Sequence, residues 1–402
     1  MSFPASRVDR PLLLSPGALL LLVLAAVGYF FLGLRFLYGI GFVSNISQDN
    51  PWGLWNWSKV IEFALSAGSF CTVGLVYVFH RTRYAAVIRP VLLYSMLGYA
   101  FVGFTIFYDI GRYYNFWHLF YPPCFNGDSV LFEVGWCLLL YLSALALEFA
   151  PIVVERFSGR VALPGPFAAL NSTAESLLTL SDKILSRLLA VIFILGIVFS
   201  FLHQSSLGGL MLITGAKLHP LWFTPWLPLL FLLSALATGF PMAILITQTA
   251  GRAFRRPFDS AITFGLGRYA HAFLGLFLVV YYMNLFLRNG FSHLALPSLE
   301  GNMFLLELSL YTLPFLLYFL RPFRTTVPGL GVLSIMTILG MMVHRANVFL
   351  IAYTAPFSDG RYVPALTEVL VLVGVFSSMI FLFRAACIIF PILPAPGKDV
   401  CP

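Results

Sequence analysis

Residues 12–38 read LLLSPGALLLLVLAAVGYFFLGLRFLY, an apolar run that contains one charged residue, Arg35. A helix needs about 20 apolar residues to cross the hydrocarbon of a bilayer, and this run is long enough. The apolar core of a cleaved signal peptide is only about 7–15 residues long, so we interpret the run as a retained transmembrane helix. It predicts a membrane protein whose first helix covers residues 17–40.

The rest of the chain has the same apolar character. Of its 402 residues, 60% are hydrophobic and 10% are charged, and the mean hydropathy is +0.90. Soluble domains contain about 25% charged residues, so lipid is the expected partner of most of this surface. The net charge of +8 does not indicate nucleic-acid binding, because loops that follow the positive-inside bias account for it.

Charged and Pro/Gly-rich breaks divide the chain into ten candidate spans. Lipid cannot satisfy unpaired backbone groups, so open sheets are excluded and the expected fold class is an all-α polytopic membrane protein. The spans start near Gly17, Trp57, Pro90, Ser129, Arg187, Pro225, Arg268, Gly301, Pro328 and Ala365.

The connecting loops predict the orientation of the chain. Ten crossings return it to the side where it began, and most of its 24 lysines and arginines fall on that side. The positive-inside bias therefore places both termini in the cytoplasm. The connector after the fifth span then faces outward. We expect it to be a loop, with Gln204, Ser205 and Ser206 satisfying the helix end and with Lys217, His219 and Trp222 lining its rim.

Ionisable residues gather in the outer halves of the predicted spans, where their cost in lipid makes them functional candidates. Glu62 and Glu133 are expected to be protonated or paired with a cation such as Arg112, and a carboxyl poised between those states can relay protons. Other residues on this side are Asp109, His203, Arg288, Glu307, His344, Arg345 and Glu368.

Several of these residues also have a purely structural explanation. Asp109 and Arg112 are spaced i,i+3, so they could form a local ion pair that holds the helix end. Toward the inner side, Arg89 fits either an interfacial anchor or a proton path. Glu148 fits either a structural carboxylate or the same path, and Tyr99 lies about midway down the third span.

Metal and haem sites are not predicted. The five cysteines are far apart and form no C-x-x-C pair, which argues against an iron–sulfur cluster or a zinc site. The seven histidines do not form the facing pair that a bis-histidine haem needs.

Two other classes of membrane protein remain as alternatives. A secondary transporter would place polar residues near the midplane of two related halves. A passive anchor for an enzyme outside the membrane would not need deep carboxylates.

Seven motifs carry a resemblance to a known family. They are PWGLW (51–55), IRPVLLYSMLGY (88–99), DIGRYYN (109–115), SVLFE (129–133), LALEFAP (145–151), HQSSLGGL (203–210) and HPLW (219–222). Together they resemble the NrfD/PsrC family, and within it the HybB branch, the membrane subunits of periplasm-facing nickel–iron hydrogenases. The resemblance runs from about Trp52 to Pro394.

The resemblance implies an architecture and a function. It implies two four-helix bundles, over residues 57–203 and 225–350, joined by a periplasmic loop (204–224) and followed by a last helix (365–391). It also implies a haem-free subunit of the bacterial inner membrane with no activity alone. This subunit would pass electrons between a periplasmic four-cluster iron–sulfur protein, with the large and small hydrogenase subunits, and menaquinone. The segment WNWSKVIEF (55–63) would place Lys59 and Glu62 at the quinone headgroup.

Orientation and resemblance together give a hypothesis for the site. The quinone-binding residues are Lys59, Glu62, Arg112 and His203. Proton transfer is assigned to Glu133, Tyr99 and Asp109, and a path inward to Arg89 and Glu148. The sequence leaves open whether the partner is a hydrogenase, a molybdopterin reductase or a multihaem cytochrome, and whether protons cross the membrane.

Overall fold

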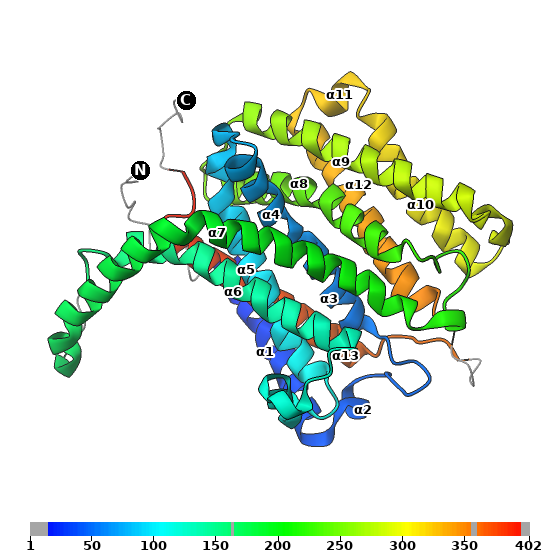
Figure 1. Cartoon of the computed structure of the whole chain (residues 1–402), viewed down its shortest axis with the longest axis horizontal. Helices are drawn as coiled ribbons and strands as arrows, with labels where there is room; N and C mark the ends of the chain where they lie inside the picture. The colour runs from blue at the N-terminus through cyan, green and yellow to red at the C-terminus, as the bar shows by residue number, and fades with distance from the viewer. Residues whose placement is uncertain (1–14, 162–164, 355–359, 395–402) are drawn as a thin grey trace.

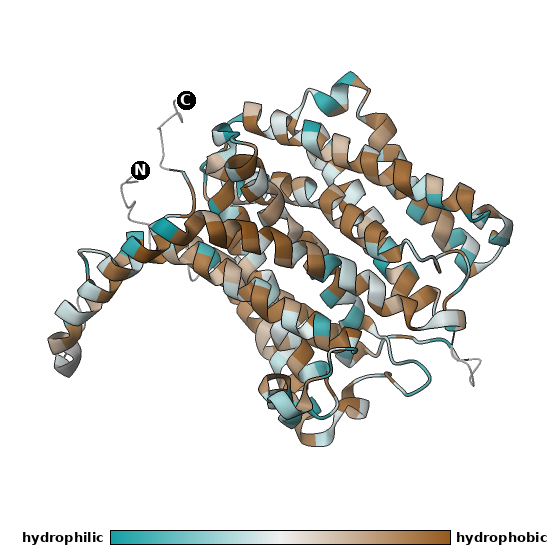
Figure 2. Cartoon of the chain, viewed as in Figure 1, coloured by the Kyte–Doolittle hydropathy of each residue, from teal (hydrophilic) through white to brown (hydrophobic). Residues whose placement is uncertain are grey.

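The computed structural model describes residues 15–161, 165–354 and 360–394. In these ranges all regular structure is helical, and the one strand-like contact is an isolated antiparallel bridge between Leu218 and Tyr353. The predicted all-α class is confirmed. The ribbons of the long helices are coloured mostly hydrophobic (Figure 2), and many of their exposed side chains are large and apolar, as expected for a surface that contacts lipid.

The long helices pack side by side (Figure 1). Their bounds are α1 Pro16–Tyr38, α3 Leu54–Leu65, α4 Ala67–Val73, α5 Ala85–Asp109, α6 Val130–Phe157, α7 Asn171–Leu212, α8 Leu227–Ala253, α9 Ser260–Leu287, α10 Leu299–Leu317, α12 Val327–Ala346 and α13 Leu366–Ile389. The π-helical turns η2 (Gly74–Val78) and η9 (Asn347–Ile351) continue α4 and α12, and α2 (Ile40–Val43) and α11 (Arg321–Arg324) are short.

Nine helices of the described residues are long and apolar enough to cross a membrane. The predicted span that is missing from these nine starts near Gly301 and corresponds to α10. This helix has 19 residues and is more polar because Glu300, Asn302 and Glu307 lie in its first half. It nevertheless packs along its neighbours: the hydroxyls of Tyr282 in α9 and Thr312 in α10 are 2.9 Å apart. We therefore describe α10 as a tenth, more polar helix of the bundle.

The pairing of α1 with α13 supports an even number of crossings. The two helices are antiparallel: Arg384 Nη2 donates to Ser15 Oγ (3.0 Å) at one end, and Thr367 Oγ1 donates to the Val43 carbonyl (2.6 Å) at the other. Since α1 begins where α13 finishes, the chain enters and leaves the bundle on the same side, and α10 completes the even count.

A buried arginine attaches α1 to the C-terminal end of α5, the end away from the side of the chain termini. Arg35 donates from Nε to the Tyr108 carbonyl (2.5 Å) and from Nη2 to the Ile110 carbonyl (2.7 Å). Carbonyls in the last turn of a helix lack partners within the helix, and a cation is favourable there. The contact therefore fixes the end of α5 that carries Asp109.

The remaining helices form two groups. Helices α3 to α7 pack on one another, as do α8, α9, α10 and α12, and the groups meet where α8 contacts α4 and α7 (Figure 1). Close approach at this contact depends on glycine, since a Cβ at Gly239 would lie 2.6 Å from Cys71 Sγ. Small residues allow such packing in membranes, where the hydrophobic effect does not drive helices together.

The connector between the two groups begins later than predicted. We expected a loop from residue 204, but α7 continues to Leu212. The polar side chains do not end the helix because they have partners on other helices: Gln204 Nε2 donates to the Phe63 carbonyl of α3 (2.8 Å), and the Ser206 hydroxyl contacts the Glu133 carboxylate of α6. His203 is consequently a fully buried helix residue.

The contact between α1 and α13 can be tested by adding one methyl group. A Cβ at Gly28 would lie 2.6 Å from Gly374 Cα, so Gly28→Ala should force the helices apart and lower stability by about 1–3 kcal/mol. At Gly33 a Cβ would meet nothing within 4 Å in the described residues, so Gly33→Ala should be neutral or stabilising. Thermal unfolding in detergent measures both; equal midpoints for the two variants would contradict the packing.

Candidate functional site

A small cavity lies between α3, α5 and α13. It is lined by Ser58, Lys59 and Glu62 of α3, by Phe101, Val102 and Thr105 of α5, and by Leu372, Val375, Phe376 and Met379 of α13. Its volume is about 20 Å³, enough for about one water molecule. One wall carries an amine and a carboxyl, and the others are almost entirely apolar. This combination is typical of sites that bind small amphiphilic molecules.

An ion pair forms at the end of the cavity that lies away from the side of the chain termini. Lys59 Nζ contacts Asp109 Oδ2, and Asn56 Nδ2 donates to the same oxygen (3.0 Å). The Lys59 and Asp109 side chains are only 12% and 9% exposed. The alternative in which Asp109 pairs with Arg112 is wrong: α5 ends at Asp109, and Arg112 is exposed beyond it with no ion pair in the described chain. Lys59 reaches Asp109 because α3 packs antiparallel to α5.

Glu62 lies deeper on the same face of α3 and is 3% exposed. Hydroxyls rather than a cation contact its carboxyl: Tyr94 OH donates to Oε2 (3.1 Å) and Ser66 Oγ to Oε1 (3.4 Å). Gly98 makes room for this arrangement, since a Cβ there would overlap Oε1 of the carboxyl. The predicted pairing of Glu62 with Arg112 is therefore absent from the described residues, and Glu62 is placed to exchange a proton with Tyr94.

His203 lies behind α3 instead of lining the cavity. Its ring packs against Phe63 (centroids 4.1 Å apart) and Tyr99 (5.6 Å), and Tyr99 packs against Tyr141 (4.5 Å). Neither ring nitrogen of His203 has a hydrogen-bond partner among the described residues. Buried polar groups are rarely left without a partner, so the imidazole is suited to bind water or a ligand group.

Glu133 is more accessible than predicted. It lies in the first turn of α6 and is exposed, because α6 begins only at Val130. Ser206 of α7 donates a hydrogen bond to its carboxylate, so Glu133 joins the N-terminal end of α6 to the C-terminal part of α7.

Arg89 and Glu148 lie toward the side of the chain termini. Arg89 Nη2 pairs with Glu155 Oε2 (2.7 Å), and its Nη1 donates to the Pro391 carbonyl (2.8 Å). Glu148 is buried against Gly196, where a Cβ would lie 2.5 Å from its Oε1. The two residues are separate from the cavity, and Arg89 is held in an ion pair that the sequence did not indicate.

The second group of helices contains a buried polar network that the sequence did not predict. Glu307 accepts hydrogen bonds from Tyr281 OH (2.5 Å) and Asn347 Nδ2 (2.7 Å), and it pairs with His344 Nδ1 (2.7 Å). Trp222 Nε1 of the connector donates to the same carboxylate (2.9 Å). Trp222 is thus buried, and the expectation that it lines the rim is wrong. The network holds the connector against α9, α10 and α12.

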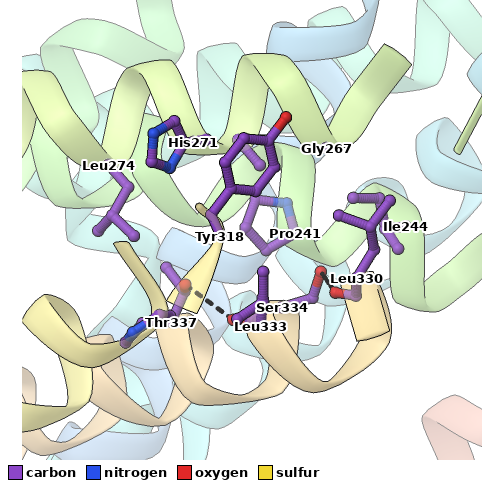
Figure 3. Close-up of a pocket in the computed structure, with 12 residues that line it drawn as sticks. Pro241, Ile244, Gly267, His271, Leu274, Tyr318, Leu330, Leu333, Ser334 and Thr337 are labelled. Carbon is purple, nitrogen blue, oxygen red and sulfur yellow. Dashed lines mark hydrogen bonds between the residues drawn. The ribbon is translucent and has the colours of Figure 1, made fainter. Parts of the chain in front are cut away.

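A further small cavity lies beside α9, α10 and α12 (Figure 3). His271 and Tyr318 face it, and the Ser334 and Thr337 hydroxyls donate to carbonyls of their own helix, Leu330 and Leu333. The two hydroxyls of α12 are therefore engaged within their own helix, and the lining contains no carboxylate or amine. The cavity bearing Lys59 and Glu62 is the better candidate for chemistry.

Fold and site together define a polytopic helical membrane protein with an amphiphilic cavity between its helices. The profile of the family described as Polysulphide reductase, NrfD matches residues 42–358. The chain belongs to the NrfD family, as its motifs predict.

Three relatives have names that describe their complexes. The Probable Ni/Fe-hydrogenase 2 b-type cytochrome subunit of Escherichia coli is 30% identical over 365 residues, 90% of this chain and 88% of that protein. A selenate reductase subunit of Mesobacillus selenatarsenatis is 25% identical over 406 residues, 92% of each chain. The Menaquinone reductase, integral membrane subunit, of Nitratidesulfovibrio vulgaris is 25% identical over 217 residues, 52% of this chain and 47% of that protein.

The first of these names includes a b-type cytochrome, but the histidines of this chain do not fit a haem. His203 packs on Phe63, His271 is stacked between Phe315 and Tyr318 (4.4 and 4.0 Å), and His344 pairs with Glu307. The other four, His80, His118, His219 and His293, lie in loops or short turns. Within the described residues each helical imidazole is packed by its neighbours, so no two of them frame the facing pair that a b haem needs.

The Lys59–Asp109 contact can be tested with a double-mutant cycle on thermal stability. Lys59→Met and Asp109→Asn should show a coupling energy of about 0.5–3 kcal/mol, because the two side chains form one partly buried pair. The matched cycle with Arg112→Met and Asp109→Asn should give no coupling. Coupling to Arg112 but not to Lys59 would restore the local i,i+3 pair.

Proposed function

We propose that this chain is the haem-free membrane subunit that passes electrons between a periplasmic four-cluster iron–sulfur protein and menaquinone. The observation that carries the proposal is the cavity in which Lys59 and Glu62 of α3 face apolar side chains of α5 and α13. A quinone has this character, with a polar ring and an apolar tail. The relative named as a menaquinone reductase subunit supports the same substrate.

In this proposal the ring lies at Lys59 and Glu62 and the tail follows α13. The cavity is narrower than a quinone ring, so Phe376 and Met379 must rotate away when the ring binds. Such side chains can change rotamer without movement of the backbone. The Lys59 ammonium then donates to a ring carbonyl, where negative charge develops as electrons arrive.

Reduction of the quinone consumes two electrons and two protons and converts both carbonyls to hydroxyls. The electrons come from the iron–sulfur partner. Glu62, in its protonated form, is placed to deliver one proton, and the hydrogen bond from Tyr94 orients its carboxyl. The Lys59 ammonium is placed to deliver the other, and Asp109, the carboxylate paired with it, can accept a proton from the outer side and pass it to the Lys59 amine; Glu133 and Ser206 form a second relay on that side.

His203, Arg112 and Tyr99 have less direct roles in this scheme. His203 acts from behind Phe63 through bound water, and Arg112 faces the partner at the outer surface. Tyr99 begins a route for protons toward the cytoplasm that continues through Glu148 and Arg89. These residues lie in the same group of helices but are not in one continuous chain of hydrogen bonds, so water must complete the route.

The proposed partners are the large and small subunits of a nickel–iron hydrogenase together with the iron–sulfur protein, in the bacterial inner membrane with both termini cytoplasmic. The E. coli relative named for hydrogenase 2 supports this choice. The relative named for a selenate reductase supports the alternative of another respiratory complex. All three names describe redox complexes, which favours a respiratory subunit over a secondary transporter.

Removing the acid at position 62 tests the proposed proton delivery. Glu62→Gln in the assembled complex should lower quinone-linked turnover by about 100-fold, because the amide can hydrogen-bond but cannot deliver a proton. Oxidation of the primary substrate with an artificial dye should stay unchanged, since the dye accepts electrons before the membrane subunit.

Glu175→Gln, which alters a half-buried carboxylate on the side of the chain termini and keeps an oxygen to accept from Gly159 N, is the matched control and should have no effect. Glu133→Gln reports separately on the outer relay. If Glu62→Gln retains full quinone-linked turnover, the assignment of the cavity fails.

The poor fit of the histidines to a haem also has a spectroscopic consequence. A reduced-minus-oxidised absorption spectrum of the purified subunit should show no b-type bands, because no two buried histidines of the described chain face each other across a space for the ring. Strong b-type bands in the purified subunit would contradict this expectation, and histidine-to-alanine variants that remove them would identify the ligands.

A further inference from the structure

The N-terminal part of α7 extends beyond the bundle. The helix has 42 residues and is therefore about 63 Å long, whereas about 20 residues cross the hydrocarbon. Residues near its other end pack on α6, where Glu148 lies against Gly196 and Glu133 contacts Ser206. The first turns, residues 171–187, diverge from the other helices on the side of the chain termini (Figure 1).

This projecting segment has one apolar face with no partner in the described residues. Leu177, Leu180, Ile184 and Leu188 recur at the spacing of one helical face, and each is 47–58% exposed. Glu175, Thr179, Asp182 and Ser186 occupy the opposite face. The segment is consequently amphipathic, as its alternating hydropathy shows (Figure 2).

The apolar face continues into the membrane-spanning part of α7. Val191, Leu195, Val198 and Leu202 follow at the same spacing and are also exposed, on the outward surface of the bundle. The helix α7 bends outward where it leaves the bundle. The apolar face that contacts lipid in its membrane-spanning part therefore turns toward the membrane surface in its N-terminal part. Lys183 and Arg187 flank the stripe, where cationic side chains can reach phosphate groups.

We propose that residues 171–188 form an interfacial helix that lies on the lipid surface, with Leu177, Leu180, Ile184 and Leu188 inserted among the headgroups. Continuity with the lipid-facing stripe favours lipid over a protein partner. The flanking lysine and arginine fit an anionic leaflet. The helix would fix the height of α7 in the bilayer independently of any activity of the complex.

Site-specific fluorescence tests this placement. In a Cys124→Ser, Cys401→Ser background, Leu180→Cys and Asp182→Cys each receive an environment-sensitive label, and the full chain is reconstituted into phosphatidylethanolamine–phosphatidylglycerol vesicles. Lipids with a nitroxide near the headgroup should quench the label at position 180 several-fold more than the label at position 182, which lies on the polar face.

Equal, weak quenching at both positions would overturn the proposal, because the helix would then stand in water. A label at position 180 that is shielded from water but not quenched by the lipid would also overturn it, in favour of a protein partner or a second copy. Repeating the measurement in neutral vesicles should reduce the quenching at position 180 if Lys183 and Arg187 contribute as proposed.

Discussion

A lipid environment offers no hydrogen bonds, and this constraint decides how the helices of this protein pair. Each polar group that leaves water must find a partner within the bundle. Arg35 does so by binding carbonyls at the end of α5, which attaches α1, and Gln204 does so by binding the Phe63 carbonyl, which attaches α7 to α3. Polar residues thus act as specific connections between helices.

The two groups of helices use their buried polar residues differently. In the second group, Glu307 has four polar partners, so its carboxylate serves to hold the connector. In the first group, Lys59 and Glu62 line a cavity. Buried polar atoms without a partner among the described residues occur in both groups, at His203 in the first and at Tyr311 and Arg345 in the second. The proposed chemistry is assigned to the first group because its cavity is lined by an amine and a carboxyl.

The sequence predicts the parts of this molecule that depend on composition and on local pattern. Apolar runs predict the helices, and the motif around Lys59 and Glu62 identifies two residues that do line the cavity. The sequence does not predict features that depend on packing between distant segments. One wall of the cavity comes from α13, about three hundred residues after α3. Lys59 rather than Arg112 pairs with Asp109, and Trp222 is buried. The polar residues after His203 suggested a loop, because their partners on other helices are not visible in a linear pattern.

The position of α13 in the chain has a consequence for biogenesis. Leu372, Val375, Phe376 and Met379 close one side of the cavity, and α13 is held in place by α1 through Gly28 and Gly374. Chains emerge from the ribosome with the N-terminal part first. The cavity around Lys59 and Glu62 can therefore close only after residue 379 has been synthesised and α13 has packed against α1. Completion of the cavity is coupled to completion of membrane insertion, so under the proposed function only the finished chain binds and reduces quinone.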